Sequence, residues 1–355
     1  MALGKKKMLH QAADSGLVNT DNFAPVTYTG NGSTQSISSL DFQPDLVWVK
    51  QRSGTGRNVL TDSVRGAERI LYSELAGGET IYAGRGLTSF DSNGFTVDDT
   101  GAINYSVNHS GTYVAWCWKA GGAAVSGTGT GGASSVSYSA NTASGFSIVE
   151  YTKSGTTGTM THGLNSAPEL ILEKRTDDTA YWNVRVTGVT GNNQTIYLNQ
   201  STEVSTHPSL NLWTTPTTSV FGYDSANAAA GDYIAYCFHS VDGYQKVGSY
   251  SGAAARATVS GLGFKPRFVM IKNATTANTD WYMWDNQRNT ITDKLNNYLL
   301  ANTNNAESGA STYALFVGDT QTAPVTNYED GFQVAAVDNI QINKTGNTYI
   351  YLAIA

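Results

Sequence analysis

The chain has 355 residues, of which 40% are apolar and only 14% are charged, with a formal net charge of −6. Such an acidic chain lacks the basic footprint of a nucleic-acid binder, so DNA and RNA are not expected ligands. No run approaches the ~20 apolar residues that span a bilayer, and we predict neither membrane insertion nor a signal peptide.

The first 22 residues show no strand pattern and contain a basic cluster of three lysines, Lys5, Lys6 and Lys7. One interpretation is an N-terminal arm that becomes ordered only against a neighbouring protein, with the lysines as anchoring residues. The alternative is a frayed terminus, because the first residues of a domain are often poorly ordered. The composition fits both.

From residue 23 onward, three anchors recur in the same order, which indicates an internal repeat. The first anchor covers residues 40–50, 164–174 and 262–272, and each copy has Pro four places after Leu and Lys six places after Pro. Pro has no amide proton and is tolerated as the first residue of a strand, so the apolar run behind it predicts a buried strand. The lysine is expected where the strand reaches solvent.

Two further anchors and an opening strand complete each copy. The second anchor is a Gly-Phe strand, clear at Gly94 and Gly331 and weaker at residues 219–222. The third anchor is a strand led by a tyrosine, namely Tyr113, Tyr233 and Tyr349. The opening strand contains the tyrosines Tyr28, Tyr151 and Tyr250. Short, closely spaced strands with Gly-rich turns predict a sandwich or a barrel.

We therefore predict an all-β fold of three tandem β-sandwich repeats, jelly-roll or lectin-like, behind a short N-terminal arm. The expected divisions are the arm (1–22), repeat 1 (23–122), a Gly/Ser/Thr-rich linker (123–143), repeat 2 (144–244) and repeat 3 (245–355). The linker rests on composition alone. Cys117 and Cys237 occupy equivalent places in two repeats, so we expect small buried hydrophobic residues rather than a disulfide.

The chain offers little catalytic chemistry. Residues 127–132 formally match a dinucleotide-binding fingerprint, but residues 133–140 do not supply the helix that this fingerprint requires. The five histidines are scattered, without the short spacing of a zinc site. Acidic doublets such as Asp177-Asp178 are expected in solvated turns, although paired carboxylates from different loops could still form a glycosidase site. We predict no enzyme, no cofactor and no metal.

Four aromatic side chains are candidates for ligand contact, since aromatic rings in a loop can stack on sugars. They are Trp213, Trp281, Tyr282 and Trp284. Buried positions of a sandwich also favour large aromatic residues, and the core interpretation is preferred.

The phrases at residues 44–50, 111–122 and 234–244 resemble a family of phage virion proteins, common in marine and cyanobacterial phages and described as tail, tail-fibre or other structural proteins. The resemblance runs from about residue 23 to residue 355. It implies a non-enzymatic virion protein, tail- or fibre-associated, that contributes to host-surface attachment. These phrases encode strands, so no site residue is carried over.

Three alternatives stay open beside this expectation. The chain could be a capsid-mounted decoration, knob or vertex protein, or a carbohydrate-binding receptor protein; a polysaccharide-degrading enzyme ranks last. Expected partners are other virion proteins through the N-terminal arm, host cell-surface polysaccharide and further copies of the chain, with a trimer favoured. The expected location is the virion, after assembly in the host cytoplasm.

Overall fold

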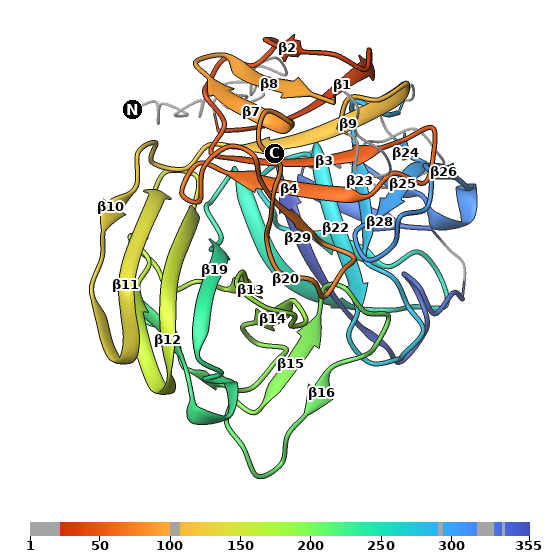
Figure 1. The fold of residues 1–355 in the computed structure, drawn as a ribbon. Helices are drawn as coiled ribbons and strands as arrows, with labels where there is room; N and C mark the ends of the chain where they lie inside the picture. Colours follow the sequence, from red (N-terminus) through yellow and green to blue (C-terminus); the bar gives the residue numbers. More distant parts are fainter. Residues whose placement is uncertain (1–21, 100–106, 290–293, 318–329, 336–337) are drawn as a thin grey trace, which may run out of the picture.

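The computed structural model describes residues 22–99, 107–289, 294–317, 330–335 and 338–355, and these form an all-β fold. The predicted all-β class is thus confirmed. Three large sheets stand around a common centre like the sides of a triangular prism, and each carries a smaller layer on its outer side (Figure 1). The described part of the chain holds no helix that is long and apolar enough to cross a membrane.

The main sheets of the three repeats share one order of antiparallel strands. Repeat 1 contains, from edge to edge, β1 (Phe23–Gly30), β9 (Gly111–Trp118), β3 (Leu46–Gln51), β4 (Asn58–Asp62), β5 (Arg69–Tyr72) and β6 (Thr80–Ile81). Repeat 2 contains β12 (Phe146–Thr161), β19 (Gly231–Phe238), β13 (Leu170–Arg175), β14 (Asn183–Val186), β15 (Gln194–Tyr197) and β16 (Ser205–Thr206). Repeat 3 contains β20 (Gln245–Ser251), β29 (Thr348–Ile354), β22 (Phe268–Asn273), β23 (Tyr282–Asp285), β25 (Asn297–Leu300) and β26 (Ser308–Gly309).

The outer layers are smaller and differ between the repeats. In repeat 1 the layer is β2 (Gln35–Ile37), β8 (Gly94–Asp98) and β7 (Gly86–Asp91). In repeat 3 it is β21 (Thr258–Ser260), β28 (Gly331–Val334), β27 (Leu315–Phe316) and β24 (Lys294–Leu295), with the 3-10 helix η2 (Ser311–Tyr313) nearby in sequence. In repeat 2 the outer layer consists of the C-terminal half of the long strand β12, then β18 (Val220–Tyr223) and then β17 (Trp213–Thr214). The 3-10 helix η1 (Ser225–Asn227) comes after β18 in the sequence.

The tyrosine landmarks form cross-strand pairs in all three main sheets. Tyr28 lies directly opposite Tyr113, and their ring centroids are 5.2 Å apart. The other two pairs are Tyr151 with Tyr233 and Tyr250 with Tyr349, at 5.8 Å and 5.0 Å. Opposed aromatic pairs stabilise neighbouring strands, which explains why each copy needs tyrosine at both places.

The glycine of the Gly-Phe anchor is required by its backbone and by its neighbours. Gly94 begins β8 at a φ of 156°, and a Cβ there would lie 1.8 Å from the carbonyl oxygen of Ile37. Gly331 begins β28 in the same way, with a Cβ position 2.0 Å from the oxygen of Val259. Only glycine tolerates this conformation and this close approach.

Residues 123–143, predicted as a flexible or extended linker, mostly form paired strands instead. They contain β10 (Val125–Ser126) and β11 (Gly129–Asn141), and β11 pairs with β12 along most of its length. Cβ atoms at Gly131 and Gly132 would lie 2.3 and 2.2 Å from carbonyl oxygens of β12. The glycine content therefore reflects the close approach of two backbones, and the linker interpretation is corrected.

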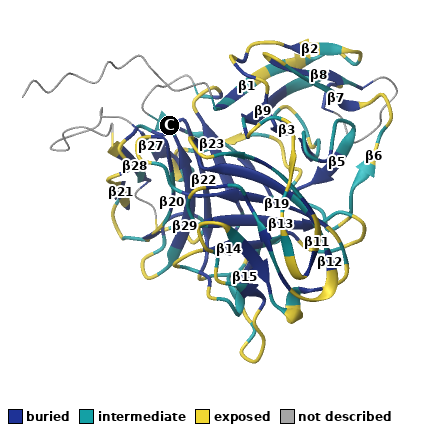
Figure 2. Cartoon of the chain, turned by 90° about the vertical axis from the view of Figure 1, so that its left-hand side faces the viewer, coloured by how far each residue is buried: buried dark blue, intermediate teal, exposed yellow. Residues whose placement is uncertain are grey.

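The three repeats share one core, whereas separate sandwiches would each enclose their own. One buried cluster joins Trp48 and Trp116 of repeat 1 to Leu172 of repeat 2 and to Phe268 and Met270 of repeat 3. A second cluster in each repeat lies between its main sheet and its outer layer. Figure 2 shows the main strands buried and the loops exposed. The two cysteines, Cys117 and Cys237, are buried and unbridged in different outer clusters.

Candidate functional site

None of the four predicted ligand-contacting aromatic residues is open to solvent. Trp281 faces the central core, and its indole nitrogen donates to the carbonyl oxygen of Tyr197 at 3.0 Å. Trp213 on β17 is 1% exposed, and Tyr282 and Trp284 on β23 are 4% and 0% exposed. The hypothesis of direct ligand contact is therefore corrected for all four, because their side chains are buried.

Tyr282 and Trp284 nevertheless form the base of an aromatic cluster that reaches the surface. We define this aromatic cluster as Tyr282, Trp284, Tyr298 and Tyr313. The ring of Tyr282 lies 4.9 Å from that of Tyr298 and 5.3 Å from that of Tyr313, which themselves are 5.4 Å apart. Tyr298 and Tyr313 are partly exposed, so the cluster presents two rings to solvent on the outer side of repeat 3. Neither tyrosine belongs to a sequence anchor, and sequence reasoning missed both.

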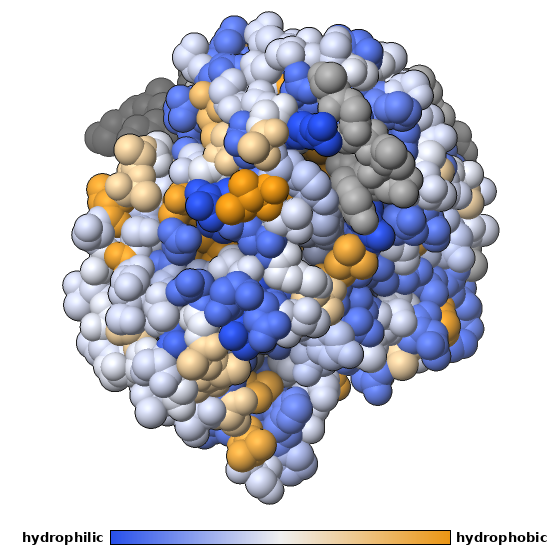
Figure 3. Space-filling model, in the orientation of Figure 1, coloured by the Kyte–Doolittle hydropathy of each residue, from blue (hydrophilic) through white to orange (hydrophobic). Residues whose placement is uncertain are grey.

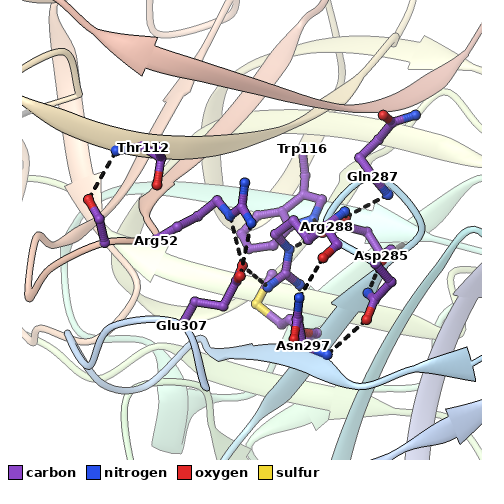
Figure 4. A network of polar contacts seen from close by, with 11 residues as sticks. Arg52, Thr112, Trp116, Asp285, Gln287, Arg288, Asn297 and Glu307 are labelled. Carbon is purple, nitrogen blue, oxygen red and sulfur yellow. Dashed lines mark hydrogen bonds and ion pairs between the residues drawn. The ribbon is translucent and has the colours of Figure 1, made fainter. Parts of the chain in front are cut away.

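The contact between repeats 3 and 1, called seam 3/1 here, contains a network of charged side chains (Figure 4). Arg288 donates from Nε to Asp285 at 2.5 Å and from Nη1 to Glu307 at 3.0 Å. Arg52 of repeat 1 donates to the same Glu307 from Nε at 2.8 Å, and Trp116 donates to Asp285 at 2.9 Å. Burial alone would raise the pKa of the Glu307 carboxyl, but the two guanidinium groups lower it below its ordinary value.

The contact between repeats 1 and 2, seam 1/2, repeats this arrangement. Arg65 donates to Asp62 at 2.6 Å and to Glu79 at 2.9 Å, as Arg288 does to Asp285 and Glu307. Tyr236 of repeat 2 takes the place of Trp116 and donates to Asp62 at 2.8 Å. In repeats 1 and 3 an Asp-x-x-Arg spacing begins at the last residue of the fourth strand, and this is the sequence signal that could have revealed both networks.

The contact between repeats 2 and 3, seam 2/3, has valine at the corresponding places. Val186 lies opposite Leu170, just as Asp62 lies opposite Leu46 and Asp285 opposite Phe268. Val189 then corresponds to the arginines, and Val204 to the glutamates. All three valines pack against the central cluster. The same seam geometry is therefore built once from apolar groups and twice from buried ions.

Backbone hydrogen bonds close the three seams into a ring. The amides of Glu79, Val204 and Glu307 donate to carbonyl oxygens of the following repeat, which belong to Thr176, Ala274 and Arg52. Each bond thus ties the region after the fifth strand of one main sheet to the end of the third strand in the next. The last bond returns to repeat 1, so every repeat is held by two neighbours.

The lysines of the first anchor are buried, contrary to the expectation that they reach solvent. Lys50, Lys174 and Lys272 are each 0% exposed, and each is the last residue but one of the third strand in its main sheet. The ammonium of Lys174 donates to carbonyl oxygens of Ala180 in its own repeat and Ala76 in repeat 1. Lys50 likewise reaches its own repeat and repeat 3, and Lys272 donates to Thr279. A long side chain can end on backbone carbonyls of a neighbouring loop, which the strand pattern does not reveal.

Burial of these lysines predicts a pH dependence of stability. Burial lowers the pKa of Lys272 from 10.5 to about 7, and nearby Asp280 and Glu203 oppose this only in part. Between pH 7 and pH 10 the unfolded chain therefore binds more protons than the folded chain, so stability rises with pH in this window. From pH 7 to pH 9 we expect Lys272 to contribute an increase of about 2 kcal/mol in the free energy of unfolding.

Urea denaturation at pH 7 and pH 9 measures this increase, and the Lys272→Met variant should show less of it. The control Lys344→Met removes an exposed lysine, whose side chain is 41% exposed, and should keep the wild-type difference. Equal pH dependence in all three proteins would show that Lys272 carries none of the effect.

A Lys-Glu-Tyr group in repeat 2 has catalytic residue types but no access. Lys153 pairs with Glu173 at 2.9 Å, and Tyr151 donates to the same carboxylate. Lys153 is 1% exposed and Glu173 is 0% exposed, so the group is enclosed under the outer layer. Glu173 takes the place of the apolar residues Val49 and Ile271 of the other repeats. The Lys153 ammonium that it binds lies over the rings of Tyr223 and Tyr233.

The other predicted features are placed as follows. Within the described residues, no group of three or more His, Cys, Asp or Glu side chains could hold a metal ion. Asp177 and Asp178 both contact Arg175, at 2.7 and 3.5 Å, in an exposed turn. The anchoring candidates Lys5, Lys6 and Lys7 lie outside the described residues.

Comparison with known proteins gives a match to a protein family. A protein-family model with the description "Domain of unknown function (DUF7483)" matches residues 18–355, which is nearly the whole chain. No curated protein and no solved structure matches the chain.

Proposed function

The chain belongs to the DUF7483 family, and for this member we propose a role as a non-enzymatic structural protein of a bacteriophage particle, tail- or fibre-associated, that contributes to host-surface attachment. The resemblance of its repeated strands to phage virion proteins first suggests the setting. A capsid-mounted decoration, knob or vertex protein has the same requirements of the fold and stays the alternative. The expected homotrimer remains a prediction.

The observation that supports a structural role is that the buried charged groups of the ring bind one another. The buried carboxylates of Asp62, Asp285 and Glu173 all accept hydrogen bonds from cations in the interior. These groups are therefore committed to joining repeats or layers and are not available to a substrate. A closed ring with a shared core gives one rigid body, as a component of a particle requires.

The surface also fits a component that must stay soluble at high copy number. In Figure 3 apolar residues form small, separated spots on a face that is otherwise polar. Within the described ranges, the large apolar residues that are exposed are far apart in sequence, namely Ile81, Val125, Tyr181, Leu210 and Ile340. Scattered residues of this kind are normal on a soluble protein and mark no broad adhesive face.

Locating the protein on purified particles tests the proposal. Mass spectrometry of washed particles of the phage that encodes the chain should find it at a constant copy number. A particle image should then place it on the tail, whereas density on the head would select the alternative. Absence from washed particles would reject the virion role, and release of reducing ends from host polysaccharide would reject the non-enzymatic one.

The aromatic cluster of repeat 3 favours a second candidate function, a carbohydrate-binding receptor protein. Two partly exposed tyrosine rings over a rigid aromatic base offer faces on which sugar rings can stack. Such rings lose little conformational freedom on binding, because Tyr282 and Trp284 already fix their positions.

For this candidate, the double variant Tyr298→Ala, Tyr313→Ala is expected to bind host polysaccharide at least about tenfold more weakly than the wild type. A tenfold loss of affinity corresponds to ~1.4 kcal/mol. A glycan array followed by calorimetric titration measures the change, with circular dichroism to verify the fold. Tyr181→Ala removes a ring that is 50% exposed outside the cluster and serves as the control. Loss of binding in the control with none in the double variant would place the sugar elsewhere.

A further inference from the structure

Arg185 differs from every other buried cation in the described residues, because it has no partner. Its residue is 5% exposed, and its Nε and Nη1 atoms are shielded from solvent without a hydrogen bond. The other buried lysines and arginines all donate to a carboxylate or a carbonyl oxygen, namely Lys50, Arg65, Lys153, Lys174, Arg267, Lys272 and Arg288. A buried charge without a partner is costly and is normally paired.

The position of Arg185 is specific to repeat 2. It lies opposite Ile171 on β14 and points away from the central core, since its neighbours Val184 and Val186 belong to that core. The corresponding residues are Thr61 in repeat 1 and Trp284 in repeat 3. The strand pairing therefore does not require arginine here. Burial lowers the pKa of Arg185 below its ordinary value, as expected for a cation that nothing compensates.

Further unpartnered polar atoms belong to the same corner of the fold. The amide of Trp213 donates to Asn192, in the turn between β14 and β15, and the amide of His207 donates to Asn193 in the same turn. The Nε1 atom of Trp213 and the Nε2 atom of His207 are buried without a hydrogen bond. The turn that follows Arg185 is thus held against a loop with two more groups that can donate.

We propose that Arg185 anchors a binding site for a small oxyanion, a phosphate, sulfate or carboxylate group, on the outer side of repeat 2. A guanidinium offers two parallel N–H groups that match such an anion, and a charge-assisted bond is strongest where water is excluded. Carboxylate or sulfate groups of an acidic polysaccharide and free inorganic anions share this chemistry. The site does not depend on the proposed virion role.

Calorimetric titration and thermal unfolding at constant ionic strength test the site, with sodium chloride as the reference. Inorganic phosphate, sulfate and glucuronate should bind saturably and raise the unfolding temperature. Arg185→Thr, which introduces the residue of repeat 1, should abolish both effects, and Arg185→Lys should weaken binding at least tenfold because the fork of donors is lost. Arg175→Thr removes a partly exposed arginine of the same repeat and should change neither effect.

The outcomes separate the sources of the anion. Binding of glucuronate without binding of glucose supports an acidic sugar, whereas binding of phosphate alone supports a free or phosphorylated anion. A wild-type response that matches sodium chloride, or one that persists in Arg185→Thr, overturns the site. If Arg185→Thr does not fold, the comparison of Arg185→Lys with Arg175→Thr still decides.

Discussion

Replacing Asp285 with alanine is expected to lower the free energy of unfolding by about 3–5 kcal/mol, because the Arg288 guanidinium would stay buried with its closest carboxylate removed. Both side chains are 0% exposed, and Asp285 also accepts from Trp116 across seam 3/1. Urea denaturation measures the loss. Asp178→Ala is the control, since this carboxylate is 62% exposed and should contribute less than about 1 kcal/mol.

Seam 2/3 shows how the same loss could be avoided. The variant D62V/R65V/E79V/Y236L gives seam 1/2 the valines of seam 2/3, together with a leucine like Leu352, which occupies the place of Tyr236 in repeat 3. Buried ion networks can often be replaced by apolar groups at little cost, so this variant should remain close to wild-type stability. Asp62→Ala alone should be as damaging as Asp285→Ala. If the fourfold variant is equally unstable, the two kinds of seam are not interchangeable.

Replacing Phe268 with alanine is expected to destabilise all three repeats together by about 3–5 kcal/mol, the usual cost of an emptied aromatic site in a core. The ring of Phe268 in repeat 3 lies 5.4 Å from Phe23 and 6.0 Å from Trp116, both in repeat 1. A shared core should unfold in one transition. Denaturation followed by fluorescence and by hydrogen exchange measures both the loss and its extent along the chain.

Phe90→Ala provides the matched control for this experiment. Phe90 is partly exposed and packs against the outer cluster of repeat 1, so its loss should be smaller and its effect on exchange should stay within that repeat. Two separate transitions in Phe268→Ala, with repeats 1 and 2 unaffected, would mean that the repeats are independent after all.

Much of the strand framework could be predicted from the sequence, because its landmarks have local causes. Pro44 precedes a strand, Gly94 needs a conformation that other residues avoid, and Tyr28 and Tyr113 face each other across two strands. Each of these demands is met by a few neighbours, so it leaves a trace in the residue types. The all-β class follows from such traces.

The shared core could not be predicted, because a buried apolar strand has the same sequence pattern whether its own repeat or another repeat covers it. In residues 46–49 both faces of the strand are buried, one against its own outer layer and one against other repeats. The burial of Lys50 could not be predicted either, since its ammonium donates to the carbonyl oxygen of Thr303 in another repeat. Contacts over such separations leave no periodicity in the sequence. The same holds for Arg185, whose isolation is visible only when its surroundings are known.

The bond between Arg52 and Glu307 joins residues 255 positions apart. Contacts between residues so far apart in sequence form late, because closing a long loop costs conformational entropy before the contact can stabilise the chain. Seam 3/1 should therefore be the last to assemble, after synthesis has passed residue 307, and until then repeat 1 exposes one apolar flank. Refolding should therefore be slow and prone to aggregation at high concentration, whereas the closed ring is durable once it has formed.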